Sequence, residues 1–185
     1  PPSHDELELM QPRQNLLSIL QISMQSEDYI RKMSSKKVTA IGYEFMIDDM
    51  GVYPVIQAMS EIVGSTSVLI AAEYLSNAFN GKGLLLGGVA GIAPTEVVII
   101  GAGAVGEYAA RAAMGLGAIV KIFDNDVYRL RSLQNRLGRR IFTSTITPSA
   151  LIKELRNADV AIGALRGSSG RTPVVVTEDM VSEMR

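Results

Sequence analysis

Apolar and polar positions along the chain fall into short blocks of two alternating kinds. Blocks that are mostly apolar, several of them rich in β-branched residues, predict strands at 16–22, 38–43, 97–100, 119–124, 141–145, 160–164 and 174–176. Apolar positions at helical spacing predict helices at 26–37, 55–79, 105–116, 126–137 and 148–156. Because strands alternate with helices over most of the length, we predict an α/β fold whose sheet is parallel.

The first 54 residues differ from the rest of the chain. They hold two of the predicted strands and one predicted helix, which begins after the capping residue Ser26. This is too little to bury both faces of a sheet, so we interpret residues 1–54 as the remnant of a second α/β domain. The long amphipathic helix at 55–79 would bridge two bodies, and residues 55–185 would form the main domain, truncated at its C-terminal end. The sequence begins at Pro1 without Met, and we expect a segment of a longer protein.

Composition argues against several classes of function. The 185 residues carry 18 basic and 19 acidic side chains, with a pI near 5.9, whereas nucleic-acid-binding proteins usually carry a surplus of Lys and Arg. The sequence has no Cys and one His, His4, which excludes disulfides, Cys nucleophiles and metal sites built from thiolates or several histidines. The most apolar stretch, 84–106, is broken by Pro94, Thr95 and Glu96, and the N-terminus lacks a secretory pattern. We therefore expect no membrane insertion, and a cytoplasmic location.

A glycine motif directly follows one of the apolar strands. Residues 97–106 read VVIIGAGAVG, a G-x-G-x-x-G between a strand of the buried type and a helix. In such a motif Gly101 allows the tight turn out of the strand, Gly103 lets a pyrophosphate approach the backbone, and Gly106 lets the helix pack on the strand. The helix N-terminus then offers free N–H groups and a partial positive charge to phosphates. The motif predicts a dinucleotide site in a Rossmann-type, doubly wound parallel sheet.

An acidic residue stands where such a site needs one. Asp124 ends the next strand, 18 residues after Gly106, and its carboxylate would accept hydrogen bonds from the adenosine ribose hydroxyls. It would repel a 2′-phosphate, so NAD is favoured over NADP. Arg129 and Arg131 lie close enough to weaken that preference, or are solvated helix residues. The alternative interpretation is a structural β-α-β turn with an incidental Asp at a strand end.

Three other places are candidates for ligand contact. The glycine-rich loop 80–91 would lie close against a ligand or another strand, or else be a flexible connector. Ser60 lies on the long predicted helix, where a serine is usually solvated or bonded to its own helix. Ala164, Leu165 and Arg166 follow a predicted strand, at the carboxyl end that faces the ligand crevice in open α/β sheets.

Longer stretches resemble a known family. The runs YPVIQAMSEIVG at 53–64, LLLGGVAGIAPTEVVIIGAGAVGEYAARAAMGLGAIV at 84–120 and ADVAIGAL at 158–165 resemble the alanine dehydrogenase and pyridine nucleotide transhydrogenase α-subunit superfamily. The patterns M-S-E-x-x-G and L-L-G-G-V-x-G-x-x-P are more specific than the glycine motif and are closer to alanine dehydrogenase. The run GAIVKIFD at 117–124 is closer to transhydrogenase. The resemblance covers the chain from about Leu16 onward.

The resemblance implies a substrate domain and a Rossmann NAD-binding domain that are joined by long helices. Residues 55–185 would be the NAD-binding domain, and residues 1–54 the end of the first half of the substrate domain. Relatives assemble through these domains and helices, so a homo-oligomer is expected. Carried over by position, Ser60 would touch the cofactor phosphates, Ala104 and Val105 the pyrophosphate, Asp124 and Arg129 the adenosine side, and Leu165 the adenine-to-ribose region.

One position departs from alanine dehydrogenases. In that family a catalytic His follows the strand that corresponds to 16–20, and here the matching residue is Gln21, which cannot exchange a proton near neutral pH. The resemblance also places the family's substrate-binding Lys and Arg upstream of Pro1 and its catalytic Asp beyond Arg185. The segment alone would therefore bind cofactor without turning over alanine.

The leading hypothesis is the NAD-binding domain of an alanine dehydrogenase-like oxidoreductase. The complete protein would pass hydride between the nicotinamide and a small amino acid or 2-oxo acid, without a metal. One alternative is the NAD-binding α-subunit of a proton-translocating NAD(P) transhydrogenase. Another is a non-catalytic NAD-binding sensor module, which Gln21 keeps open.

Overall fold

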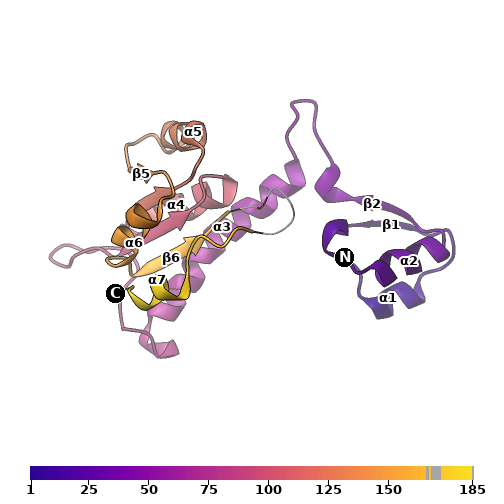
Figure 1. Ribbon diagram of the computed structural model, residues 1–185, viewed down its shortest axis with the longest axis horizontal. Coiled ribbons are helices and arrows are strands. Elements are labelled where there is room, and N and C mark those ends of the chain that lie inside the picture. Colours follow the sequence, from indigo (N-terminus) through magenta and orange to yellow (C-terminus); the bar gives the residue numbers. More distant parts are fainter. Residues whose placement is uncertain (166, 168–171, 185) are drawn as a thin grey trace. The chain divides into compact units, whose positions relative to one another are not determined.

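The computed structural model describes residues 1–165, 167 and 172–184, and Arg166 therefore lies outside the described residues. The chain divides into two compact units, Pro1–Met59 and Ser60–Arg185, each of which is an α/β assembly with parallel strands (Figure 1). The predicted fold class is confirmed.

The first unit is a small sheet of two parallel strands with two helices. Ser26 caps the second helix as predicted, because its hydroxyl accepts a hydrogen bond from the Tyr29 N–H. The strand predicted at 16–22 is shorter than expected, since the backbone turns into the left-handed region at Gln21. In chain order the elements are α1 (His4–Leu9), β1 (Asn15–Ser18), the 3₁₀ turn η1 (Ile22–Met24), α2 (Glu27–Ser35), β2 (Thr39–Gly42) and the 3₁₀ turn η2 (Tyr43–Phe45).

The long predicted helix is α3 (Pro54–Leu75), with 22 residues. It ends four residues earlier than predicted, because the chain passes through the 3₁₀ turn η3 (Asn77–Phe79) into the left-handed Asn80. By length and composition α3, and not the stretch 84–106, is the described helix that is apolar enough to cross a membrane. One face of α3 packs into the core of the second unit through Val68 and Leu75.

The second unit is built on a four-stranded parallel sheet in the order β5-β4-β3-β6. From β3 the chain moves outward through β4 to β5 and then returns to the other side of β3, so the strand order reverses between β3 and β6. In open α/β sheets ligands bind at the carboxyl ends of the strands where this reversal occurs. The elements are β3 (Glu96–Ile100), α4 (Ala104–Gly115), β4 (Ile119–Phe123), α5 (Val127–Leu137), β5 (Phe142–Ser144), α6 (Pro148–Leu155), β6 (Val160–Gly163) and α7 (Glu178–Ser182).

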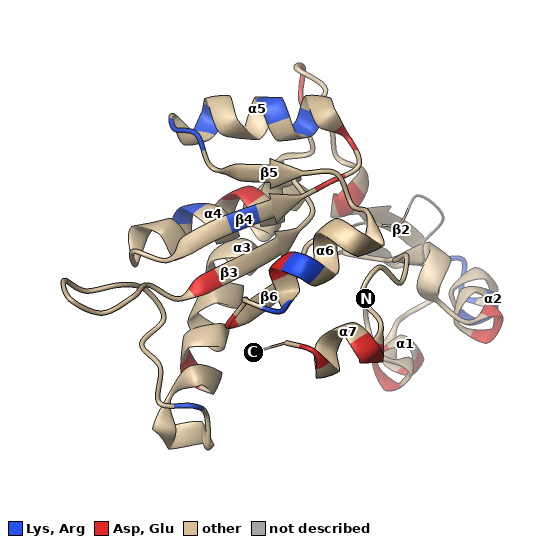
Figure 2. Cartoon of the chain, turned by 60° about the vertical axis from the view of Figure 1, so that its left-hand side comes forward, with Lys and Arg blue, Asp and Glu red and all other residues tan. Residues whose placement is uncertain are grey.

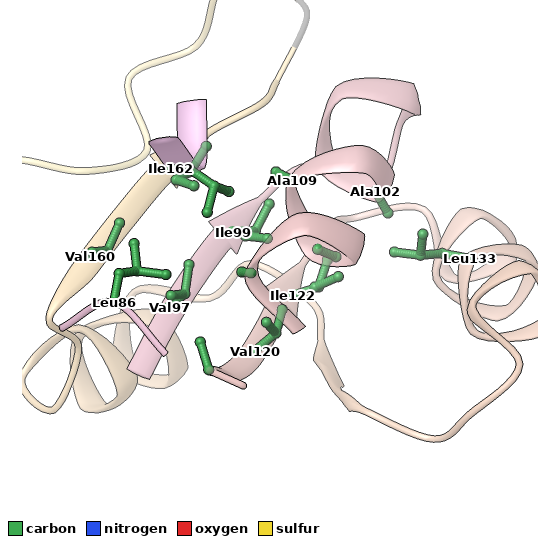
Figure 3. Close-up of a cluster of buried hydrophobic side chains, with 14 of the residues drawn as sticks. Leu86, Val97, Ile99, Ala102, Ala109, Val120, Ile122, Leu133, Val160 and Ile162 are labelled. Carbon is green, nitrogen blue, oxygen red and sulfur yellow. The ribbon is translucent and has the colours of Figure 1, made fainter. Parts of the chain in front are cut away.

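Side chains of β3 alternate between two cores, as a strand buried on both faces requires. Val97 and Ile99 enter a core that α3, α4 and α5 cover (Figure 3). Val98 and Ile100 enter a second core, which α6 covers. Because helices lie on both faces of the sheet, the sheet is doubly wound.

One predicted strand is wrong. Residues 174–176 are β-branched but form no ladder in the described chain, and Val175 and Val176 instead pack beside the second core as irregular backbone. A strand needs the hydrogen-bonding edge of a neighbour, and the local residue pattern does not reveal whether that edge is within reach.

A buried ion cluster joins the sheet to α6. The Lys121 ammonium on β4 pairs with the carboxylates of Glu96 on β3 and of Glu154 on α6, and its side chain is 13% exposed. Burial lowers the pKa of Lys121, but its hydrogen bonds to the two carboxylates outweigh burial, and the net pKa lies above the ordinary value.

Candidate functional site

The glycine motif forms the connection between β3 and α4, and two of its glycines are required by the protein itself. Gly101 has φ +124°, and a Cβ there would lie 2.4 Å from the Ala164 carbonyl oxygen. A Cβ on Gly106 would lie 1.9 Å from the Gly101 carbonyl oxygen. Real side-chain carbons do not approach this closely, so these two residues must be glycine for the turn to close on β6 and for α4 to pack against it.

Gly103 has a different environment. A Cβ there would meet no atom within 4 Å, and φ is −78°, a value that any residue adopts. Nothing in the described fold therefore requires a glycine at this position. Gly103 is also the N-cap of α4, and no side chain caps that helix. The N–H groups of the first turn, which includes Ala104 and Val105, therefore lie at the positive end of a 12-residue helix without a side-chain cap.

Asp124 braces this loop from the end of β4. One carboxylate oxygen accepts a hydrogen bond from the Ala102 N–H at 2.7 Å, and the other accepts from the Asp126 N–H at 2.8 Å. The Asp124 residue is 5% exposed. Sequence reasoning identified Asp124 but missed this bracing role. Each carboxylate oxygen keeps a further lone pair for a ribose hydroxyl.

The basic residues near Asp124 are engaged elsewhere. The Arg129 guanidinium lies 3.5 Å from the Asp126 carboxylate on the first turn of α5, and the Arg131 guanidinium lies 6.0 Å from the Tyr128 ring centre. Figure 2 shows that positive charge in this region lies along α5. The carboxyl end of β4 therefore keeps an acidic character.

The carboxyl end of β6 meets the glycine motif directly. The Ala164 N–H donates to the Ile100 carbonyl oxygen at 2.7 Å, and the Ala164 carbonyl lies against Gly101. Leu165 follows it and packs beside the second core. These two candidates therefore lie at the reversal point between β3 and β6, beside Gly101.

Ser60 lies on α3 one helical turn before the point where α3 packs on α4. Gly64, one turn further along α3, is buried against the first turn of α4, and a Cβ there would lie 2.4 Å from the Val105 carbonyl oxygen. Residues four apart share a face of a helix, so Ser60 lies on the face of α3 that contacts α4.

The glycine-rich loop 80–91 packs at the opposite end of the sheet. A Cβ on Gly87 would lie 2.2 Å from the carbonyl oxygen of Leu116, in the turn that leads into β4. The Gly88 N–H donates to that same carbonyl, and the Gly87 N–H donates to Thr95. Gly87 and Gly88 therefore approach another part of the chain, the turn before β4.

Gln21 lies in the first unit, just past the carboxyl end of β1. Its φ and ψ are both 47°, and its side chain is exposed. The N–H groups of Leu20 and Gln21 both donate to one carboxylate oxygen of Glu44, which follows β2. Burial raises the pKa of Glu44, but these backbone N–H groups outweigh burial, and the pKa lies below its usual range. This role of Glu44 was not identified from the sequence, although an acidic residue that follows a strand was a signal for it.

Chemically, the second unit offers an uncapped helix N-terminus, an open backbone at Gly103 and a carboxylate 5% exposed, all at the carboxyl edge of the sheet. These groups suit a phosphate and a ribose. Among the described residues no cluster of His, Asp and Glu side chains could hold a metal ion.

Comparison with known proteins places these features in a family. The family described as alanine dehydrogenase/PNT, C-terminal domain, matches residues 67–185. The chain is 35% identical over its whole length to the alanine dehydrogenase of Methanococcus maripaludis, and 39% identical over 153 residues to that of Bacillus subtilis. It spans about half the length of the curated relatives it matches, 49% in the first case and 40% in the second.

Solved structures agree with this result. An L-alanine dehydrogenase superposes with a TM-score of 0.88 at 36% identity, over 100% of this chain and 51% of that one. The transhydrogenase from Sinorhizobium meliloti superposes with a TM-score of 0.79 at 20% identity, over 100% of this chain and 53% of that one, and it shows the fold alone. The resemblance found in the sequence is confirmed.

Proposed function

Because this chain belongs to the alanine dehydrogenase and pyridine nucleotide transhydrogenase family, we propose that residues 55–185 are an NAD-binding domain of an NAD-dependent oxidoreductase. The observation that carries the proposal is Gly103. Gly101 and Gly106 are needed to close the fold, whereas Gly103 has open space where its side chain would be. A glycine that the fold does not need is explained by a ligand that approaches its backbone closely.

The residues around Gly103 fit a dinucleotide. We assign the pyrophosphate to the N–H groups of the first turn of α4, with Gly101, Gly106, Ala104 and Val105 shaping that turn. Ser60 would approach the same phosphates from α3.

The rest of the dinucleotide is assigned by what lies at the carboxyl edge. Asp124 would accept from the adenosine ribose, Arg129 would flank the adenosine, and Ala164 and Leu165 would line the path towards the nicotinamide side at the end of β6. When bound, NAD supplies the carbon that accepts or returns hydride. The protein's part is to hold the phosphates, orient the ribose and shield the reacting ring from water.

NAD is favoured over NADP by the charges at the end of β4. A 2′-phosphate would have to sit beside the Asp124 carboxylate and near Asp126, and the Arg129 guanidinium that could offset it already faces Asp126. Repulsion at such short range outweighs a single exposed cation.

For the complete protein we propose hydride transfer between NAD and a small amino acid or 2-oxo acid, as the name alanine dehydrogenase states for the relatives. Residues 1–54 would be the end of one half of the substrate domain. Gln21 stands at the position where these relatives are expected to carry a catalytic His, so the segment by itself would be inactive. Gln21 keeps two other candidates open, a transhydrogenase α-subunit and a cofactor-dependent sensor.

We also propose that the protein is a cytoplasmic homo-oligomer that assembles through α3. Apolar side chains on α3 that are 41–68% exposed would form this interface: Met59, Ile62, Val63, Leu69, Ile70 and Tyr74. An exposed apolar set of this size is typical of a surface that a second protein covers.

The proposal is tested by titrating the chain with NADH and NADPH and following nicotinamide fluorescence, which no Trp obscures. We expect saturable binding of NADH and weaker binding of NADPH, with the difference reduced in Asp124→Ala. Asp126→Ala is the comparison variant: it removes a neighbouring carboxylate that caps α5 without contacting the glycine motif, so it should leave NADH binding unchanged and affect only NADPH. Absence of NADH binding by both this chain and the complete protein would refute the proposal.

The activity of the complete protein is tested at Gln21. Alanine-dependent formation of NADH should be absent or slow in the natural protein and should rise in Gln21→His, because His can exchange a proton at neutral pH. If the protein binds NADH but Gln21→His forms no NADH from alanine and NAD, the result supports the transhydrogenase and sensor alternatives. Hydride transfer to an NADP analogue after addition of a membrane subunit would identify the former.

A further inference from the structure

The contact between α3 and α4 contains a residue that the cofactor assignment does not use. Gly64 is buried on α3, and the three atoms nearest to its missing side chain belong to α4. A Cβ there would lie 2.4 Å from the Val105 carbonyl oxygen and 2.9 Å from the Ala109 N–H nitrogen. These are the two ends of one helical hydrogen bond, so the backbone of α3 rests directly on the backbone of α4.

The two helices run in the same direction. Gly64 lies beside Val105, at the start of α4. Eleven residues later on α3, the Leu75 carbonyl accepts a hydrogen bond from the Gly83 N–H of the loop 80–91. Gly87 of the same loop packs on Leu116, which lies eleven residues after Val105. Because equal lengths of helix join the two contacts, the residues that precede Gly64 extend past the N-terminus of α4.

The parallel packing of α3 on α4 would place Ser60 beside the glycine motif. Ser60 precedes Gly64 by one helical turn, on the same face, and one turn before Val105 along α4 lies the loop at Gly101. The distance between Ser60 and the loop at Gly101 therefore depends on how closely α3 packs on α4.

We propose that Gly64 is a positioning residue for the cofactor phosphates: its missing side chain lets α3 approach α4 closely enough for Ser60 to reach a pyrophosphate at the α4 N-terminus. This inference rests on the proposed function and adds the element that sets its geometry. Ordinary van der Waals contact begins at 3.4 Å, so a methyl group 2.4 Å from the Val105 oxygen forces the helix backbones about 1 Å apart. A displacement of that size withdraws a hydroxyl from hydrogen-bonding distance.

The test is a double-substitution cycle measured as the Kd for NADH. We expect Ser60→Ala to weaken binding about fivefold in the natural background, and Gly64→Ala to weaken it by about the same factor. In Gly64→Ala, Ser60→Ala should have little further effect, because the hydroxyl is already out of reach. The matched control is Gly115→Ala, also a helical glycine, where an added Cβ meets nothing within 4 Å and NADH binding should be unchanged.

Two results would overturn the inference without touching the cofactor assignment. An unchanged Kd in Gly64→Ala would do so while natural NADH binding remained, and so would a Ser60→Ala effect of equal size in both backgrounds. If Gly64→Ala does not fold, Ser60→Asp serves instead, because a carboxylate beside a pyrophosphate should weaken NADH binding at least tenfold with an unchanged Tm. Unchanged binding by Ser60→Asp would show that position 60 does not face the phosphates.

Discussion

Replacing Asp124 by Ala is expected to destabilise the protein before any cofactor is added. The change removes an acceptor from the Ala102 N–H, in a residue that is 1% exposed, and from the Asp126 N–H, which water can reach more easily. A buried N–H left without a partner costs about 1–3 kcal/mol, and the second, charge-assisted bond adds about 1 kcal/mol. We therefore expect a loss of about 2–4 kcal/mol in the free energy of unfolding.

The measurement is urea unfolding of the whole chain without ligand, followed by far-UV circular dichroism. Asp126→Ala is the control: it removes a capping carboxylate whose side chain is 44% exposed, and such a change costs about 1 kcal/mol. Equal losses in the two variants, or a loss below about 0.5 kcal/mol in Asp124→Ala, would refute the bracing role. A stability change alters NADH and NADPH binding together, so their ratio, and not either affinity alone, reports the ribose contact.

Three further predictions concern the glycine motif, the ion cluster at Lys121 and the exposed face of α3. Gly103→Ala should leave the Tm within 2 °C of the natural value while abolishing measurable NADH binding. Gly106→Ala should instead unfold the second unit, because its Cβ would lie 1.9 Å from a carbonyl oxygen. Normal NADH binding by Gly103→Ala would contradict the argument that a ligand approaches this glycine. Lys121→Ala should lower the free energy of unfolding by about 3 kcal/mol, because it leaves two largely buried carboxylates unpaired. Because the pKa of Lys121 is raised on folding, the stabilising effect of Lys121 should be full below pH 10.5 and should fade as the pH rises further. A Tm that does not change with pH above 10.5 would contradict this. Leu69→Asp should shift the chain towards the monomer in sedimentation without lowering its Tm, and an unchanged oligomer would argue against the exposed face of α3 as the interface.

The sequence predicted the sheet and its main site well because both depend on local pattern. Blocks that are apolar on both faces mark buried parallel strands, and the glycine motif with Asp124 requires only short spacings along the chain. The predicted helices agree with α2, α4, α5 and α6 to within about three residues, since Ser26, Asp126 and Thr147 cap three of them. Local signals of this kind need no knowledge of the tertiary fold.

The features that were missed depend on contacts between distant residues. Nothing around Gly64 in the sequence shows that a second helix passes over it, and the bracing of Ala102 by Asp124 joins residues 22 apart. The loop 80–91 has the composition of a phosphate-binding loop, but its Gly87 packs closely on the Leu116 carbonyl. A glycine's identity alone does not tell whether the atom that excludes a side chain belongs to the protein or to a ligand.

The turn at Gln21 bears on whether the Gln21→His experiment is a fair one. A non-glycine residue in the left-handed region costs about 1–3 kcal/mol and persists only where the surroundings enforce it. Here the enforcement comes from backbone groups: the Leu20 and Gln21 N–H groups bind Glu44, and the Gln21 carbonyl accepts from Met24. Because the Gln21 side chain is exposed and contributes to none of these bonds, His can replace it without releasing the turn. The imidazole would then be presented from the same backbone position, so a failure to oxidise alanine would reflect the chemistry of the site and not a collapsed loop.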